Sequence, residues 1–162
     1  MLIHVDMSGQ LNEKKAVGVA WYCAETSQHR GVALSPQFKK KVLSSVKDNE
    51  VFPKIYASCI FLLILDYLDD ISSVVICNDE PFTLVKNHLS LLLGEITDTP
   101  PEILSKTQFQ RNSGITRFRS PADNFANHYR KRGLKRRKLF QGKKLHIKQI
   151  TVSEITALIK KK

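Results

Sequence analysis

The stretch Ile-His-Val-Asp-Met-Ser-Gly, residues 3–9, decides the fold of this chain. Its apolar and polar residues alternate with the two-residue period of a β-strand, and the Ser-Gly pair that closes it is typical of a turn. The strand therefore carries one carboxylate, Asp6, at the point where it ends. An isolated aspartate at a strand end is usually satisfied by the amides of the turn, so the function of Asp6 depends on what lies beside it.

The rest of the chain alternates between β-rich and amphipathic segments, and Pro36 separates an antiparallel meander of three short strands from a succession of helices and strands. Residues 72–78 form a continuous apolar run, as in a strand buried on both faces, which favours parallel pairing. The predicted strands are residues 3–9, 16–23, 30–35, 72–78 and 103–109. The predicted helices are residues 38–46, 53–68, 81–94 and 121–132, the last three each opening on a proline. The pattern predicts an α/β fold with a mixed five-stranded sheet, three antiparallel strands followed by parallel strands, flanked by helices.

The net positive charge of the chain comes from its C-terminal end. The 26 Lys and Arg residues against 15 Asp and Glu residues give a net charge of +11. Residues 1–129 hold 13 basic and 14 acidic residues, a net charge of −1, whereas residues 130–162 hold 13 basic residues and only Glu154, a net charge of +12. A localised basic block is typical of a protein that binds a polyanion, most often nucleic acid. We therefore divide the chain into a globular domain, residues 1–132, and a basic C-terminal extension, residues 133–162.

The extension contains a dense basic cluster and two further elements. The cluster would bind phosphates without reading base sequence, with an affinity that falls steeply with salt. It consists of Lys135, Arg136, Arg137 and Lys138. The alternatives are a signal of the nuclear-localisation type or a run that only keeps the protein soluble. Beyond the cluster, residues 145–150 predict a short strand, and the capping box from Thr151 to Glu154 predicts a last helix.

The cysteines and the N-terminus indicate an intracellular protein. Cys23, Cys59 and Cys77 each lie in an apolar run, and no pair has the spacing of metal ligands, so we interpret them as buried thiols. The N-terminus lacks the charged-then-apolar pattern of a signal peptide, and the longest mainly apolar run, residues 55–65, is too short to span a bilayer. We expect no membrane partner, and a location in the cytoplasm or with nucleic acid in a nucleoid or nucleus.

Three carboxylates lie at comparable ends of these elements. A meander whose first strand is central, followed by a right-handed crossover, places Asp6 and Asp79 on adjacent strands, and the helix of residues 121–132 can bring Asp123 over the same edge. Converging carboxylates repel one another unless a cation lies between them, and oxygen ligands suit Mg²⁺ or Mn²⁺ rather than zinc. Two such ions about 4 Å apart would activate water and stabilise the leaving oxygen of a phosphodiester.

In these elements and acids the chain resembles the ribonuclease H-like superfamily over about residues 1–132. The matching residues are Asp6 in Ile-His-Val-Asp-Met-Ser-Gly, Asp79 in Val-Val-Ile-Cys-Asn-Asp and Asp123 in Ser-Pro-Ala-Asp-Asn-Phe-Ala-Asn. The resemblance implies a ribonuclease H-like sheet and a metal-dependent endonuclease that cuts the RNA strand of an RNA/DNA hybrid or a related phosphodiester, with these three acids holding Mg²⁺ or Mn²⁺. At i+4 and i+7 from Asp123, Asn127 and Arg130 share its helix face and would contact the nucleic-acid backbone near the cut.

The chain departs from that family at one metal-binding position. The family's Glu in the first turn of the helix after the third strand has no clean counterpart, because that position is Lys54 here. Glu50 lies just upstream and would serve only if the helix began earlier, while a lysine among the carboxylates could neutralise them in place of a metal. The family's glycine-flanked histidine is also missing, and Arg117 and Arg119 occupy that neighbourhood. The second hypothesis is therefore a catalytically inactive ribonuclease H-fold protein that binds nucleic acid. A fragment of an actin-like ATPase shares the core but would lack the second lobe of the nucleotide cleft.

Overall fold

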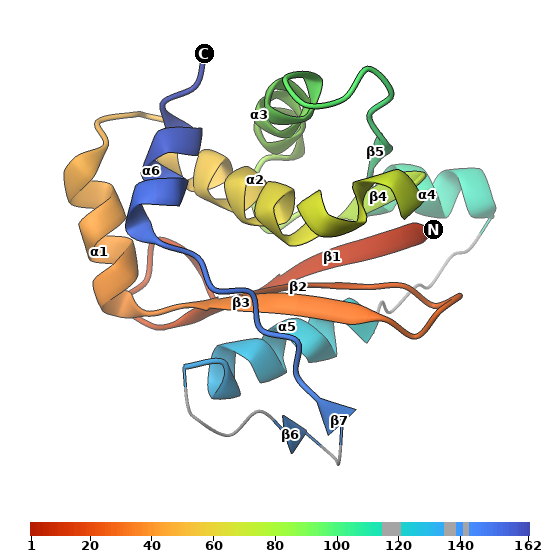
Figure 1. Cartoon of the computed structure of the whole chain (residues 1–162), viewed down its shortest axis with the longest axis horizontal. Helices are drawn as coiled ribbons and strands as arrows, with labels where there is room; N and C mark the ends of the chain where they lie inside the picture. The colour runs from red at the N-terminus through yellow and green to blue at the C-terminus, as the bar shows by residue number, and fades with distance from the viewer. Residues whose placement is uncertain (115–120, 135–138, 141–142) are drawn as a thin grey trace.

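A mixed five-stranded sheet with the order β3-β2-β1-β4-β5 forms the centre of the molecule in the computed structural model, which describes residues 1–114, 121–134, 139–140 and 143–162 (Figure 1). The central strand β1 (Leu2–Ser8) runs antiparallel to β2 (Val17–Tyr22), which in turn pairs antiparallel with β3 (His29–Leu34). On its other side β1 runs parallel to β4 (Ser73–Ile76), and β4 runs parallel to β5 (Glu102–Ser105). The predicted α/β class and the mixed sheet are confirmed.

The helices cover the two faces of this sheet unequally. Helix α5 (Pro121–Arg132) packs across β2, β1 and β3 on one face (Figure 1). Helix α4 (Lys106–Ser113) lies on the same side, because its Phe109 ring contacts the ring of His4, which alternates with the core residues of β1. The remaining helices cover the opposite face: α1 (Pro36–Ser45), α2 (Val51–Ile64), the 3-10 helix η1 (Leu65–Asp70), α3 (Phe82–Gly94) and α6 (Val152–Ile159). A small two-stranded sheet joins β6 (Leu139–Phe140) and β7 (Lys143–Lys144).

Strand β1 is buried on both faces, and the alternation of its side chains determines on which face the Asp6 carboxylate lies. Ile3, Val5 and Met7 belong to the large core with α2 and α3. Asp6 alternates with them and lies opposite Ala20 of β2, and Ala20 packs with Ala126 of α5. Because directly opposed residues of antiparallel strands share a face, the Asp6 side chain lies on the α5 side of the sheet.

Helix α5 approaches the sheet closely because β2 has a glycine beneath it. A Cβ atom at Gly18 would lie 2.1 Å from the carbonyl oxygen of Ala126 and 2.5 Å from the amide nitrogen of Arg130. No side chain fits at that distance, so the glycine allows backbone-to-backbone packing. This packing holds Arg130 beside the end of β1, since Gly18 lies opposite Ser8.

Three element boundaries differ from the sequence predictions. The predicted strand over residues 103–109 ends at Ser105, because Ser105 and Gln108 form a capping box that starts α4. Helix α2 begins at Val51 rather than Pro53. The predicted strand over residues 145–150 is reduced to one bridge between Gly31 and Ile147.

The C-terminal extension returns to the domain. The capping box of Thr151 and Glu154 starts α6, as predicted, and Ile155 and Ile159 of that helix are buried in the large core. Leu145 is buried against α5 and β2. Residues 145–159 are therefore packed on the sheet domain.

The segment Val51–Asp70 is more apolar than the sequence count suggested. The segment has 20 residues and includes an 18-residue stretch with a mean hydropathy of 1.7, so by length and composition alone it could cross a membrane. More than half of it is buried inside the domain, where α2 packs against α3, α6 and β2. That is the environment of a core helix in a soluble domain.

Candidate metal centre

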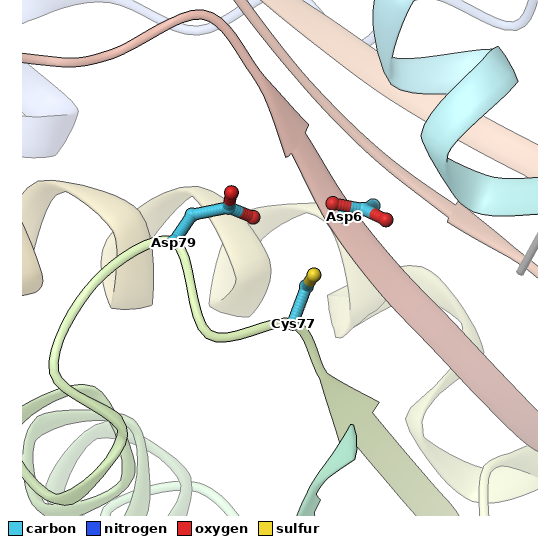
Figure 2. A group of neighbouring side chains, drawn as sticks. All are labelled: Asp6, Cys77 and Asp79. Carbon is cyan, nitrogen blue, oxygen red and sulfur yellow. The ribbon is translucent and has the colours of Figure 1, made fainter. Parts of the chain in front are cut away.

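Two carboxylates and a thiol converge where β1 and β4 end. Figure 2 shows Cys77 just past the end of β4, Asp79 on the loop that follows and Asp6 on β1, with their side chains turned toward one another. One carboxylate oxygen from each aspartate and the thiol sulfur lie within 4.8 Å of one another. The parallel pairing of β1 with β4 produces this arrangement, because it brings the carboxyl ends of both strands to the same edge. The predicted proximity of Asp6 and Asp79 is therefore found, with Cys77 as an additional member.

Burial and the nearby carboxylate of Asp79 disfavour the ionised form of Asp6. Its side chain is 6% exposed, and desolvation, followed by the negative charge of Asp79, raises the pKa of Asp6 to about 7. Hydrogen bonds from the Cys77 thiol and from the Met7 amide, which donates to Asp6 Oδ1 at 2.9 Å, oppose the rise. Among the described residues no lysine or arginine forms an ion pair with Asp6 or Asp79. A divalent cation bound between them would stabilise the ionised form of this pair.

A pocket of about 310 Å³ opens onto Asp79. Glu80 and Phe52 line it together with the turn that follows β1, where Gly9 adopts a φ of 88°. Burial and the charge of Asp79 raise the pKa of Glu80. Glu80 is therefore a third acidic group at the mouth of the site, and the consecutive acids after strand 72–78 are a signal in the sequence from which it could have been found.

Tyr56 of α2 is a buried polar group within electrostatic range of this cluster. Its side chain is fully buried, and its hydroxyl has no hydrogen-bond partner. Burial, followed by the negative charges of Asp79, Asp6 and Cys77, raises the pKa of this phenol well above its ordinary value. A buried hydroxyl without a partner carries a desolvation cost of about 1–3 kcal/mol, which a ligand of the cluster would relieve.

Lys54 and Glu50 lie outside the carboxylate cluster. The Lys54 Nζ is 2.6 Å from Asp48 Oδ2, and both Lys54 and Glu50 line a different pocket, next to His88. The interpretation that Lys54 stands among the carboxylates is therefore wrong. The residue in the first turn of α2 that lines the Asp79 pocket is Phe52. Glu50 is the N-cap residue of α2 and is not among the groups gathered around Asp6.

Asp123 lies in the first turn of α5 with an exposed side chain, and it is not one of the groups within 4.8 Å of Asp6 and Asp79. Farther along the same helix, Arg130 Nη2 donates to Asn127 Oδ1 at 3.0 Å, so these two side chains lie on one face of α5. Arg130 also borders the turn after β1, since a Cβ at Gly9 would lie 3.4 Å from Arg130 Cδ. The basic cluster of residues 135–138, together with Arg117 and Arg119, falls outside the described part of the chain.

Helix α4 adds a cation that the sequence prediction missed. Burial, followed by the positive charge of Lys106, the first residue of α4, lowers the pKa of His4 to about 4. The same charge opposes the rise in the pKa of the Cys77 thiol. Burial is the largest cause that raises the pKa of Cys77, and the charges of Asp6 and Asp79 add to it. The segment was predicted to be a strand, so Lys106 was not considered as a neighbour of the site.

No family model, curated protein or solved structure matches this chain. The chemistry of the site is therefore argued from its groups. Two carboxylates held close together, one of them protonated up to about neutral pH, can bind a divalent cation in place of that proton. A pocket beside them leaves room for a substrate oxygen.

Proposed function

We propose that this protein is a divalent-metal-dependent nuclease of ribonuclease H type, which hydrolyses phosphodiester bonds and has the RNA strand of an RNA/DNA hybrid as its substrate. The observation that carries the proposal is the approach of Asp6 and Asp79 at the ends of two parallel strands, without a cationic side chain paired to either in the described part of the chain. The order of the sheet, with three antiparallel strands followed by two parallel ones, supports the ribonuclease H comparison.

The donor set fits Mg²⁺ or Mn²⁺, because both ions prefer carboxylate oxygens and keep open positions for water and phosphate. Asp6 and Asp79 would hold the ion, and the Met7 amide fixes the orientation of the Asp6 carboxylate. A bound divalent cation supplies an activated water and stabilises the charge on the leaving oxygen. Glu80 lines the same pocket as Asp79 and is placed to accept a proton from water.

The nucleic acid would pass along α5. Arg130 borders the turn after β1, which lines the pocket, and its guanidinium is held by Asn127. A guanidinium in that position can pair with a backbone phosphate next to the cut. Asp123 is exposed on the same helix, where it can take part in binding an ion together with the substrate.

A catalytically inactive nucleic-acid-binding protein is the second candidate, and the apolar Phe52 favours it. The family to which the chain is compared has a metal-binding Glu in the first turn of this helix, and here an aromatic side chain lines the pocket instead. Asp123 also lies outside the close cluster. In this alternative the basic C-terminal extension binds nucleic acid, and the carboxylates do not catalyse cleavage.

The deciding experiment is cleavage of a labelled RNA/DNA hybrid, with single- and double-stranded RNA and DNA in parallel, in Mg²⁺, in Mn²⁺ and in EDTA. We expect cleavage only when Mg²⁺ or Mn²⁺ is present, and none in EDTA. The Asp79→Asn variant should lose at least about 100-fold in rate, because it removes a ligand from the centre. The matched control is Asp98→Asn, which alters an exposed aspartate that precedes β5 and should leave the rate unchanged.

Three results would contradict the nuclease. They are cleavage that persists in EDTA, cleavage that survives in Asp79→Asn, and salt-sensitive binding of every substrate without cleavage in either metal. The last result would establish the inactive binding protein instead.

A further inference from the structure

We propose that Cys77 is a ligand of the metal centre, so that the centre holds a borderline divalent ion such as Zn²⁺, Co²⁺ or Cd²⁺ more tightly than Mg²⁺. This inference rests on the proposed function for the ligands Asp6 and Asp79, but it does not depend on the reaction. The three side chains offer two carboxylate oxygens and one sulfur within 4.8 Å of one another.

The position of Cys77 distinguishes it from the other two cysteines. Cys23 and Cys59 are fully buried in the large apolar core. Cys77 is partly exposed, follows directly after β4, and its thiol hydrogen-bonds to the Asp6 carboxylate. Packing explains the first two thiols, whereas Cys77 lies beside two acids, one of which, Asp79, lines a pocket.

Tyr56 provides an independent indication that the cluster takes a ligand. Its hydroxyl is fully buried, within electrostatic range of both aspartates and Cys77, and has no hydrogen-bond partner. Buried polar groups are nearly always satisfied, so an unpaired hydroxyl at this point indicates a missing donor or acceptor. A water molecule bound to an ion in the cluster would supply one.

The ligand types determine which ions suit the site. Mg²⁺ binds oxygen ligands and gains little from a neighbouring thiol, whereas Zn²⁺, Co²⁺ and Cd²⁺ accept thiolate together with carboxylate. Three protein ligands with one open position are the composition of a catalytic rather than a structural zinc site. When sulfur binds, the thiol proton is released to the solvent, so Cys77→Ser should release one proton fewer than the wild type for each ion bound.

The test is a titration of the metal-free full-length protein with Co²⁺ and with Cd²⁺, following the sulfur-to-metal charge-transfer absorption. The wild-type protein should develop this absorption up to one equivalent of metal. Cys77→Ser should lose it and bind Cd²⁺ at least about tenfold more weakly, while its affinity for Mg²⁺ should change less than about threefold. The matched control, Cys59→Ala, alters a buried thiol of α2 and should keep the absorption.

Two results would overturn the proposal: Co²⁺ binding to the wild type without sulfur absorption, and absorption that survives in Cys77→Ser. If Cys77→Ser does not fold, alkylation of the wild type followed by peptide mapping decides the question, because Cd²⁺ should protect the partly exposed Cys77, and unchanged alkylation would contradict ligation. Metal-dependent cleavage without sulfur absorption would refute this inference alone. Sulfur absorption without cleavage of any substrate would refute the nuclease alone.

Discussion

Two groups of acids in this molecule show opposite ways of accommodating negative charge. Asp66 is half-exposed in η1, and its Oδ2 lies 3.3 Å from Arg30 Nη2 and 3.1 Å from Lys148 Nζ. Asp6 is buried, and the nearest groups that share its environment are Asp79 and a thiol. Asp66 is neutralised by cations of its own chain, whereas Asp6 and Asp79 form no ion pair among the described residues. This is the difference expected between a structural carboxylate and one that binds a cation, as we propose for Asp6.

The largest expected effect is on the stability of the metal-free protein. Asp6 has its pKa raised from 3.8 to about 7 by folding, so its ionisation destabilises the fold as the pH rises from about 4 to about 7. Asp6→Asn removes this cost and should raise the free energy of unfolding by about 2–4 kcal/mol at pH 7.5. Urea unfolding at pH 4, 5.5 and 7.5 measures the change. A difference from the wild type that does not grow with pH would contradict the assignment.

A divalent cation should stabilise Asp6 and Asp79 and so make them resemble the neutralised Asp66. At about 100 times its dissociation constant, Mn²⁺ should stabilise the wild type by about 2.7 kcal/mol, a rise of about 5–10 °C in melting temperature. Asp79→Asn should lose most of this rise, because it lacks one ligand. Asp66→Asn serves as the control and should keep it in full. An equal rise in all three proteins would indicate binding elsewhere.

The Tyr56 hydroxyl should have a smaller effect that depends on the ion. Without metal, Tyr56→Phe should stabilise the protein by up to about 1 kcal/mol, because it removes a buried group that has no partner. With Mn²⁺ present the gain should shrink or reverse, because the wild-type hydroxyl then bonds to water on the ion. Thermal unfolding of both proteins with and without Mn²⁺ measures this. A gain that Mn²⁺ leaves unchanged would separate Tyr56 from the site.

The smallest expected effect on stability is that of replacing Asp66, the acid that forms two ion pairs. Asp66→Asn breaks two ion pairs at a half-exposed position and should cost only about 0.2–1 kcal/mol. Because exposed charges are screened, the loss should fall when unfolding is measured in 1 M rather than 0.05 M NaCl. A loss that is independent of salt would mean that the ion pairs do not stabilise the fold.

Much of the fold could be predicted from periodicity. The alternation in residues 3–9 and the apolar run of residues 72–78 predict a central strand and its parallel neighbour, and β1 and β4 pair in that way. Their ends place Asp6 and Asp79 together without further information. The final helix was predictable because Thr151 and Glu154 form a capping box at its start.

What could not be predicted depends on helix phase and on the path of the chain after strands. Lys54 and Phe52 are two positions apart on α2, so their side chains point about 200° apart around the helix. An error of two residues in the predicted register therefore places Lys54, instead of Phe52, at the Asp79 pocket. Cys77 lies in an apolar run, and only the position where β4 ends turns its thiol toward the acids. Ser105 and Gln108 carried a capping signal, but the apolar residues before them favoured an extended strand.

The packing of α6 has a consequence for synthesis of the chain. Ile155 and Ile159 complete a core whose other walls are α1 and α2, which leave the ribosome about a hundred residues earlier. Until residues 152–159 emerge, part of the most apolar helix of the protein stays uncovered in the nascent chain. During translation this protein should therefore depend on chaperones that bind apolar segments. These chaperones should dissociate only when α6 packs against α1 and α2.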